Sequence, residues 1–275
     1  MKKLTPLLLV GLAAALPLAR VHAQFINYTT PGSTLSENFD GLISSGNVGN
    51  AFSATIGAQS PIPNLTGWQG AKIAGAGTTA TNFTANDGSA TSGGLYSYGP
   101  NGSTDRALGA LASGTNTMAF GAAILNQTGI TLTEFTITYD GEFWRSSTNQ
   151  QNTLSFFYGF DVTPGVSPTN FLSSTGMIAH TPLDLVGPSP VTNSAALDGN
   201  LAANRTAGIT STITGLNWQP GQILFIAWRD FDNTGSDAGL AVDNFTFTAI
   251  PEPSTWALIA LGIGFLLFRL RRKNA

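Results

Sequence analysis

Residues 228–237 read Trp-Arg-Asp-Phe-Asp-Asn-Thr-Gly-Ser-Asp and could bind a hard cation. Asp230, Asp232 and Asp237 could offer carboxylate oxygens to Ca²⁺, which takes about 6–8 oxygen ligands. The segment is not an EF-hand loop, because the twelfth position counted from Asp230 is Ala241 and not a bidentate Glu. The alternative is that these acids cap turns or pair with an arginine. If calcium binds here, we expect it to be structural.

Asp140 and Glu142 form a second candidate pair, within Tyr-Asp-Gly-Glu-Phe-Trp-Arg. Residues two apart on a strand share one face, so both carboxylates could point the same way. A glycosidase needs such a pair, with one pKa raised and a cleft between the two groups. The sequence shows neither feature, so a polysaccharide hydrolase is the less favoured hypothesis.

Other catalytic residue types are scarce. The chain has no cysteine, which excludes thiol chemistry and Cys-based metal sites. Of its two histidines, His22 falls in the predicted leader, so a Ser-His-Asp triad would have to use His180. No Gly-x-Ser-x-Gly motif is present, and His180 is more simply a strand-end or loop residue. We therefore predict that the protein is not an enzyme and has no cofactor, apart from a possible structural calcium.

Charge is distributed unevenly along the chain. Residues 24–250 hold five of the 12 Lys and Arg and 14 of the 15 Asp and Glu, a net charge of −9. Nucleic-acid binding requires phosphate neutralisation by cations, so we expect no nucleic-acid partner. Four of the five cations lie within a few residues of an acid, and we expect each to form an ion pair that pins a loop; they are Arg106, Arg145, Arg205 and Arg229.

The elements that must position these residues are strands. In residues 134–139, Glu-Phe-Thr-Ile-Thr-Tyr, apolar side chains occupy alternate positions, which predicts one buried and one exposed face. Turn pairs such as Asn101-Gly102 separate the segments, and no helical periodicity is sustained. The expected strands are 131–139, 153–160, 223–228 and 240–248. The pattern predicts an all-β, antiparallel, jelly-roll-like sandwich spanning 24–250 as one domain.

Four tryptophans of this body suggest an alternative function, that of a carbohydrate-binding module. They are Trp68, Trp144, Trp218 and Trp228. Flat aromatic faces can stack on sugar rings. Core packing is the competing explanation, particularly for Trp228, which lies in an apolar strand.

Both ends of the chain carry targeting features. Lys2 and Lys3, an apolar run over 7–18 and Val21-His22-Ala23 predict a signal peptide of residues 1–23. At the other end, Pro-Glu-Pro precedes the uncharged segment 255–268, and a basic cluster follows it. The segment is short, but a terminal Trp256 and the flanking cations favour a single transmembrane helix over a buried one.

This tail, residues 251–275, resembles the PEP-CTERM sorting signal of Gram-negative bacteria. The resemblance rests on the Pro-Glu-Pro motif and the basic cluster, namely Pro251, Glu252, Pro253, Arg269, Arg271, Arg272 and Lys273. It implies recognition by an exosortase, transient residence in the inner membrane, and delivery to the cell surface or an exopolysaccharide matrix. It implies nothing about an activity of the body.

Segments between about Asp105 and Thr248 also resemble a β-sandwich module of PEP-CTERM proteins. They are Ser-Thr-Asp-Arg-Ala-Leu-Gly (103–109), Tyr-Asp-Gly-Glu-Phe-Trp-Arg (139–145), Leu-Asp-Gly-Asn (197–200) and the stretch ending in Gly-Leu-Ala-Val-Asp-Asn-Phe (239–245). The resemblance implies a jelly-roll or concanavalin-like body. We therefore expect an exported, non-enzymatic surface or biofilm-matrix protein associated with exopolysaccharide.

Overall fold

The computed structural model of this protein describes residues 25–161 and 170–252. The predicted signal peptide and transmembrane segment lie outside these residues. Of the predicted sorting residues, Pro251 and Glu252 are described, whereas Pro253 and the basic cluster are not. Within the described residues, no helix is long and apolar enough to span a membrane.

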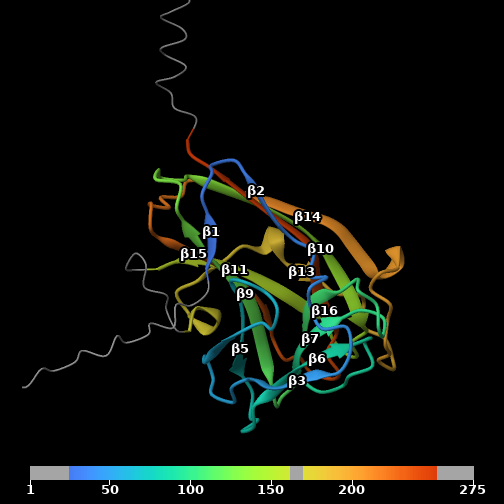
Figure 1. The fold of residues 1–275 in the computed structure, drawn as a ribbon. Coiled ribbons are helices and arrows are strands. Elements are labelled where there is room, and N and C mark those ends of the chain that lie inside the picture. The colour runs from blue at the N-terminus through green and yellow to red at the C-terminus, as the bar shows by residue number, and fades with distance from the viewer. Residues whose placement is uncertain (1–24, 162–169, 253–275) are drawn as a thin grey trace, which may run out of the picture.

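Two eight-stranded sheets pack against each other as a sandwich (Figure 1). The first sheet has the order β12-β11-β15-β9-β5-β4, with β1 beside β9 and β13 beside β11. Its strands are β1 (Ile26–Tyr28), β4 (Gln59–Pro61), β5 (Trp68–Ala74), β9 (Thr117–Asn126), β11 (Thr153–Phe160), β12 (Ile178–Ala179), β13 (Leu185–Val186) and β15 (Ile223–Asp230). Three 3-10 helices accompany the sheets: η1 (Phe171–Ser173), η2 (Thr181–Leu183) and η3 (Ala202–Asn204).

The second sheet has the order β14-β10-β16-β8-β7-β6-β3, with β2 also paired to β16. Its strands are β2 (Thr34–Glu37), β3 (Asn47–Phe52), β6 (Thr81–Asn86), β7 (Gly94–Tyr98), β8 (Ala107–Leu111), β10 (Glu134–Arg145), β14 (Arg205–Ile213) and β16 (Gly239–Ile250). The all-β sandwich prediction is confirmed.

Strand pairing departs from the prediction at two places. Most neighbours are antiparallel, as predicted, but β1 pairs in parallel with β9 and β6 pairs in parallel with β7. Residues 87–93 return the chain from the end of β6 to the start of its parallel neighbour. A purely antiparallel sandwich is therefore wrong for these two pairs.

The core lies between the two sheets, where alternating side chains of β10 point inward. Phe135, Ile137 and Tyr139 are fully buried, whereas Thr136 and Thr138 are only half-buried. Strand β15 is buried along its whole length, because η1 covers the outer side of its sheet. Trp228 lies at the centre of the core and contacts several aromatic rings, namely Trp68, Phe120, Tyr139, Phe156 and Phe245.

A backbone irregularity in β16 shapes the second sheet. Asn244 has a positive φ of 49°, which a non-glycine residue seldom adopts. Val242 and Phe245 both belong to the core on either side of it. In a regular strand one residue separates two inward-facing residues, but here two residues lie between Val242 and Phe245. Both of them, Asp243 and Asn244, therefore lie on the outer face.

Candidate functional site

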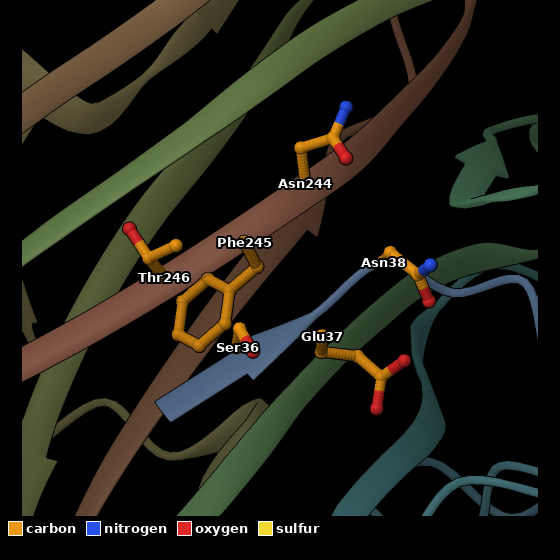
Figure 2. Close-up of a pocket in the computed structure, with 6 residues that line it drawn as sticks. All are labelled: Ser36, Glu37, Asn38, Asn244, Phe245 and Thr246. Atoms are coloured by element: carbon orange, nitrogen blue, oxygen red, sulfur yellow. The ribbon is translucent and has the colours of Figure 1, made fainter. Parts of the chain in front are cut away.

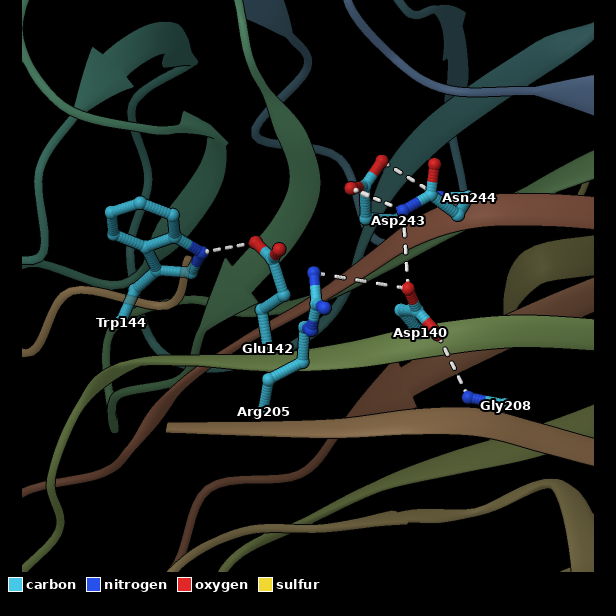
Figure 3. A network of polar contacts seen from close by, with 7 residues as sticks. All are labelled: Asp140, Glu142, Trp144, Arg205, Gly208, Asp243 and Asn244. Atoms are coloured by element: carbon cyan, nitrogen blue, oxygen red, sulfur yellow. Dashed lines mark hydrogen bonds and ion pairs between the residues drawn. The ribbon is translucent and has the colours of Figure 1, made fainter. Parts of the chain in front are cut away.

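A polar network gathers on the outer face of the second sheet (Figure 3). It contains Asp140 and Glu142 of β10, Asp243 and Asn244 of β16, and Arg205 at the start of β14. The strand register brings these side chains together, because Asp140 pairs with Asp243 and Glu142 pairs with Arg205 across adjacent strands. Segments that the sequence singled out separately are thus brought together.

Asp140 is the half-buried centre of this network. Its Oδ1 accepts a hydrogen bond from the Gly208 amide at 2.8 Å. Its Oδ2 accepts one from Asn244 Nδ2 at 3.1 Å and lies 3.9 Å from Arg205 Nη1. The carboxylate therefore ties β10 to both neighbouring strands, which is a structural role.

Glu142 is buried, with 1% of its surface exposed. Its Oε2 accepts a hydrogen bond from the Trp144 indole N–H at 2.9 Å. Burial raises the pKa of Glu142 to about 7; the Trp144 hydrogen bond opposes this rise, and the charge of Asp105 adds to it. Glu142 is thus partly protonated near neutral pH.

Asp243 is also buried, with 4% of its surface exposed. Burial raises its pKa to about 7, against the hydrogen bond from the Asn244 amide at 2.7 Å. The negative charges of Glu142 and Asp105 contribute to the rise. The charge of Glu142 therefore makes Asp243 hold its proton more tightly, and burial disfavours the charged form of both carboxyls.

Beside the network lies a hollow of about 410 Å³ (Figure 2). Its lining comes from β2 with the residue after it and from β16, namely Ser36, Glu37, Asn38, Asn244, Phe245 and Thr246. Neither Glu142 nor Asp243 lines it. Its wall combines hydroxyl, amide and carboxylate groups with an apolar part that includes Phe245, an arrangement that can both hydrogen-bond and contact a ligand of mixed polarity.

The calcium candidates lie elsewhere, at the end of β15 and in the loop after it. Asp230 is fully buried, and within the described residues neither of its oxygens has a hydrogen-bond partner. Burial and the charge of Asp237 raise its pKa well above the usual value. Asp237 accepts hydrogen bonds from Asn152 Nδ2 at 2.7 Å and from the Asn233 amide at 3.1 Å, and burial raises its pKa to about 6. Asp232 influences the pKa of both acids.

The three acids therefore do approach one another, but the calcium hypothesis gains no support from their arrangement. In residues 25–161 and 170–252, no three His, Cys, Asp or Glu side chains are placed to hold a metal ion. Asp237 is engaged by amides, and Asp230 is enclosed by the protein.

The predicted arginine–carboxylate pairs form in one case of four. Within the described chain, Arg205 pairs with Asp140. The other three arginines donate to backbone carbonyls: Arg106 to Ser97 and Pro100, Arg145 to Gly88, and Arg229 to Phe171 and Ser174. They still fasten loops, as predicted, but through carbonyl acceptors.

The tryptophans proposed to stack on sugars are all core residues. Their exposed fractions are at most 1% for Trp68, Trp144, Trp218 and Trp228. Trp144 stacks on Tyr98, with ring centroids 5.8 Å apart, and is covered by the turn at Gly199. None of the four is available for a ligand, so sugar stacking on them is excluded.

His180 contacts a hydroxyl, with 2.8 Å between its Nε2 and Ser211 Oγ. Burial raises the pKa of the nearby Asp184, whereas His180 lowers it, and Asp184 Oδ1 accepts a hydrogen bond from the Phe156 amide at 2.7 Å. None of the three lines the hollow described above. The arrangement is that of a residue linking the 178–184 segment to β14.

Sequence reasoning did not assign Asp243 and Asn244 to the same site as Asp140. The sequence does hold one signal for them, because the pair Asp243-Asn244 interrupts the alternation of apolar residues in this strand. Asn tolerates positive φ, so the pair could have indicated a backbone irregularity that turns both side chains to the outer face.

Comparisons with known proteins bear mainly on the tail. Residues 249–273 match the PEP-CTERM protein-sorting motif. No curated protein matches the chain in sequence. Among solved structures, that of TmCBM61 in complex with β-1,4-galactotriose is similar at a TM-score of 0.25 and 7% identity, covering 54% of this chain and 74% of that chain. So low a TM-score assigns no function to the body. The sorting motif implies processing by an exosortase and an exported, surface-sorted protein.

Proposed function

We propose that this protein is a non-catalytic component of the cell surface or extracellular matrix, and that its body associates with exopolysaccharide. The observation that carries the proposal is the sorting motif at residues 249–273. The body adds an outer face with a hollow of about 410 Å³, lined by hydroxyl, amide and carboxylate groups together with Phe245. Its inner-membrane stage is transient, and the tail acts as a sorting handle.

Removal of residues 251–275 tests the sorting step. We expect the full chain to be recovered from the cell surface or matrix fraction, and the truncated chain to be lost from it. Changing Arg271, Arg272 and Lys273 to Gln is a milder variant that keeps the chain length. Identical localisation and processing of both variants would refute the proposal.

A hydrolase is the second candidate, because a carboxyl with a pKa near 7 is what general acid catalysis requires. Glu142 and Asp243 meet that condition. Their enclosure argues for a structural role, since substrate must reach a general acid directly. Release of reducing sugar from matrix polysaccharide by the wild type, abolished in Glu142→Gln, would favour the hydrolase instead.

A further inference from the structure

Four neighbouring strands of the second sheet carry the same short pattern of hydroxyl residues. It reads Thr-Leu-Ser in β2 (34–36), Thr-Ile-Thr in β10 (136–138), Thr-Ser-Thr in β14 (210–212) and Thr-Phe-Thr in β16 (246–248). The middle residue of each triplet points toward the core side, as the burial of Ile137 and Phe247 shows. The outer residues therefore all project from the outer face.

Strand register aligns these hydroxyls in two rows, which we call the hydroxyl face. The first row is Thr212, Thr136, Thr248 and Thr34; the second is Thr210, Thr138, Thr246 and Ser36. The rows are about 6.6–6.8 Å apart along a strand, and the strands are about 4.7–4.9 Å apart. All eight side chains are exposed or half-buried.

The hydroxyls are already ordered by contacts across the strands. Thr136 Oγ1 and Thr212 Oγ1 are 2.7 Å apart, as are Thr138 Oγ1 and Thr210 Oγ1. Thr34 Oγ1 lies 3.3 Å from Thr248 Oγ1. A hydroxyl group has one donor and two acceptor sites, so each keeps hydrogen-bonding capacity after such a contact.

We propose that the hydroxyl face binds a neutral, hydroxyl-rich polysaccharide chain that crosses β14, β10, β16 and β2. The inference rests on the proposed matrix function and names the surface and the class of polymer. Sugar hydroxyls can donate to and accept from threonine hydroxyls, and threonine methyl groups can contact the apolar C–H faces of sugar rings.

Charge decides which polymer fits. Neither row contains a charged residue, so the face offers nothing to neutralise an anionic chain. Asp140 lies two residues beyond Thr138 and offsets the charge of the nearby Arg205, its ion-pair partner, and the body carries a net charge of −9. An anionic polysaccharide is repelled, whereas a neutral one is not.

Sheet twist favours a flexible polymer over a rigid crystal surface. Adjacent strands rotate by about 20–25°, so the face turns by about 60–75° from β14 to β2. A flat lattice could meet only part of it, but a polymer chain can follow the twist. The second row also leads into the hollow of Figure 2, because Thr246 and Ser36 line it together with Asn38 and Asn244.

Affinity electrophoresis of the purified full chain in mild detergent tests the proposal. The gels contain neutral galactomannan, neutral dextran or anionic alginate. The variant is Thr138→Val with Thr246→Val, since valine keeps the shape and strand preference and removes only the hydroxyl. Thr84→Val with Thr153→Val is the matched control, because both are half-buried strand threonines outside the hydroxyl face.

We expect at least one neutral gel to retard the wild type and the control, and the variant's apparent dissociation constant to rise at least about fivefold. Alginate should not retard any of them. Thermal unfolding checks that the variant folds; Thr210→Val with Thr212→Val, on edge strand β14, replaces it if it does not.

The failures are distinguishable. A wild type retarded by a neutral gel, with both variant pairs retarded equally, would overturn the hydroxyl face and leave the proposed function standing. No retardation of the wild type by any gel would overturn both. Retardation by alginate alone would overturn the assignment of a neutral ligand.

Discussion

Replacing Glu142 by Gln should make the protein more stable above neutral pH. In the native state this carboxyl is enclosed beside Asp243, and burial raises its pKa to about 7 from 4.5. Deprotonation therefore costs more in the folded protein than in the unfolded chain. Gln keeps the size of the side chain and an oxygen that can accept the Trp144 indole N–H, but it carries no charge.

The sign and size of the effect follow from linkage. Between about pH 4.5 and about pH 7 the folded state holds a proton that the unfolded state has lost, so the free energy of unfolding falls as the pH rises. A pKa rise from 4.5 to about 7 corresponds to about 3 kcal/mol. Because burial is the main cause of this rise, we expect Glu142→Gln to recover about 2–3 kcal/mol at alkaline pH.

Urea unfolding followed by tryptophan fluorescence, repeated from about pH 4 to about pH 9, measures this difference. Glu134→Gln on the same strand is the control for losing one negative charge at a half-buried position. The variant and wild type should converge near pH 4 and diverge above pH 7. Equal stability at all pH values, or a variant less stable at high pH, would show that Glu142 is not held in a charge-disfavouring environment.

Three further results are expected. Trp228→Ala should lower the free energy of unfolding by about 3–5 kcal/mol in urea titrations, because its ring is central to the core. Gly199→Ala should cost about 1–3 kcal/mol in thermal unfolding. Its new Cβ would lie 2.5 Å from Trp144 Nε1, whereas Gly49→Ala meets no atom within 4 Å and serves as its control. Asp230→Asn should leave the melting temperature unchanged at acid pH and raise it at alkaline pH, since burial raises the pKa of this acid; a lower value at both would refute this.

The local alternation of apolar and polar residues was sufficient to locate the strands that have one buried and one exposed face. The predicted strand 153–160 is β11 itself, and 223–228 and 240–248 lie within β15 and β16. The strand predicted at 131–139 begins at Glu134 and continues to Arg145. Its continuation was missed because Glu142 and Trp144 are both buried on the outer side, under the loops around Gly88 and Gly199, so the alternation expected of an exposed face is lost.

Contacts of polar and aromatic side chains could not be predicted in the same way. The four tryptophans could have been surface or buried residues. The packing of the two sheets buries Trp68, Trp218 and Trp228, whereas loops on the outer side of the second sheet bury Trp144. Arg106, Arg145 and Arg229 each have an acid nearby in sequence, yet they bind carbonyls. Successive side chains on a strand point to opposite faces of the sheet, so residues that are adjacent in sequence often cannot contact each other.

The sequence by itself determined the sorting motif, the acidic body and the β-class, because each depends on composition or on the order of residues within one short segment. Tertiary structure alone decided the site. Asp140 and Asn244 lie 104 positions apart and meet at 3.1 Å, and four Thr/Ser triplets from distant segments form one face. Both depend on strand register, which is set by the packing of the whole core and by the irregularity at Asn244.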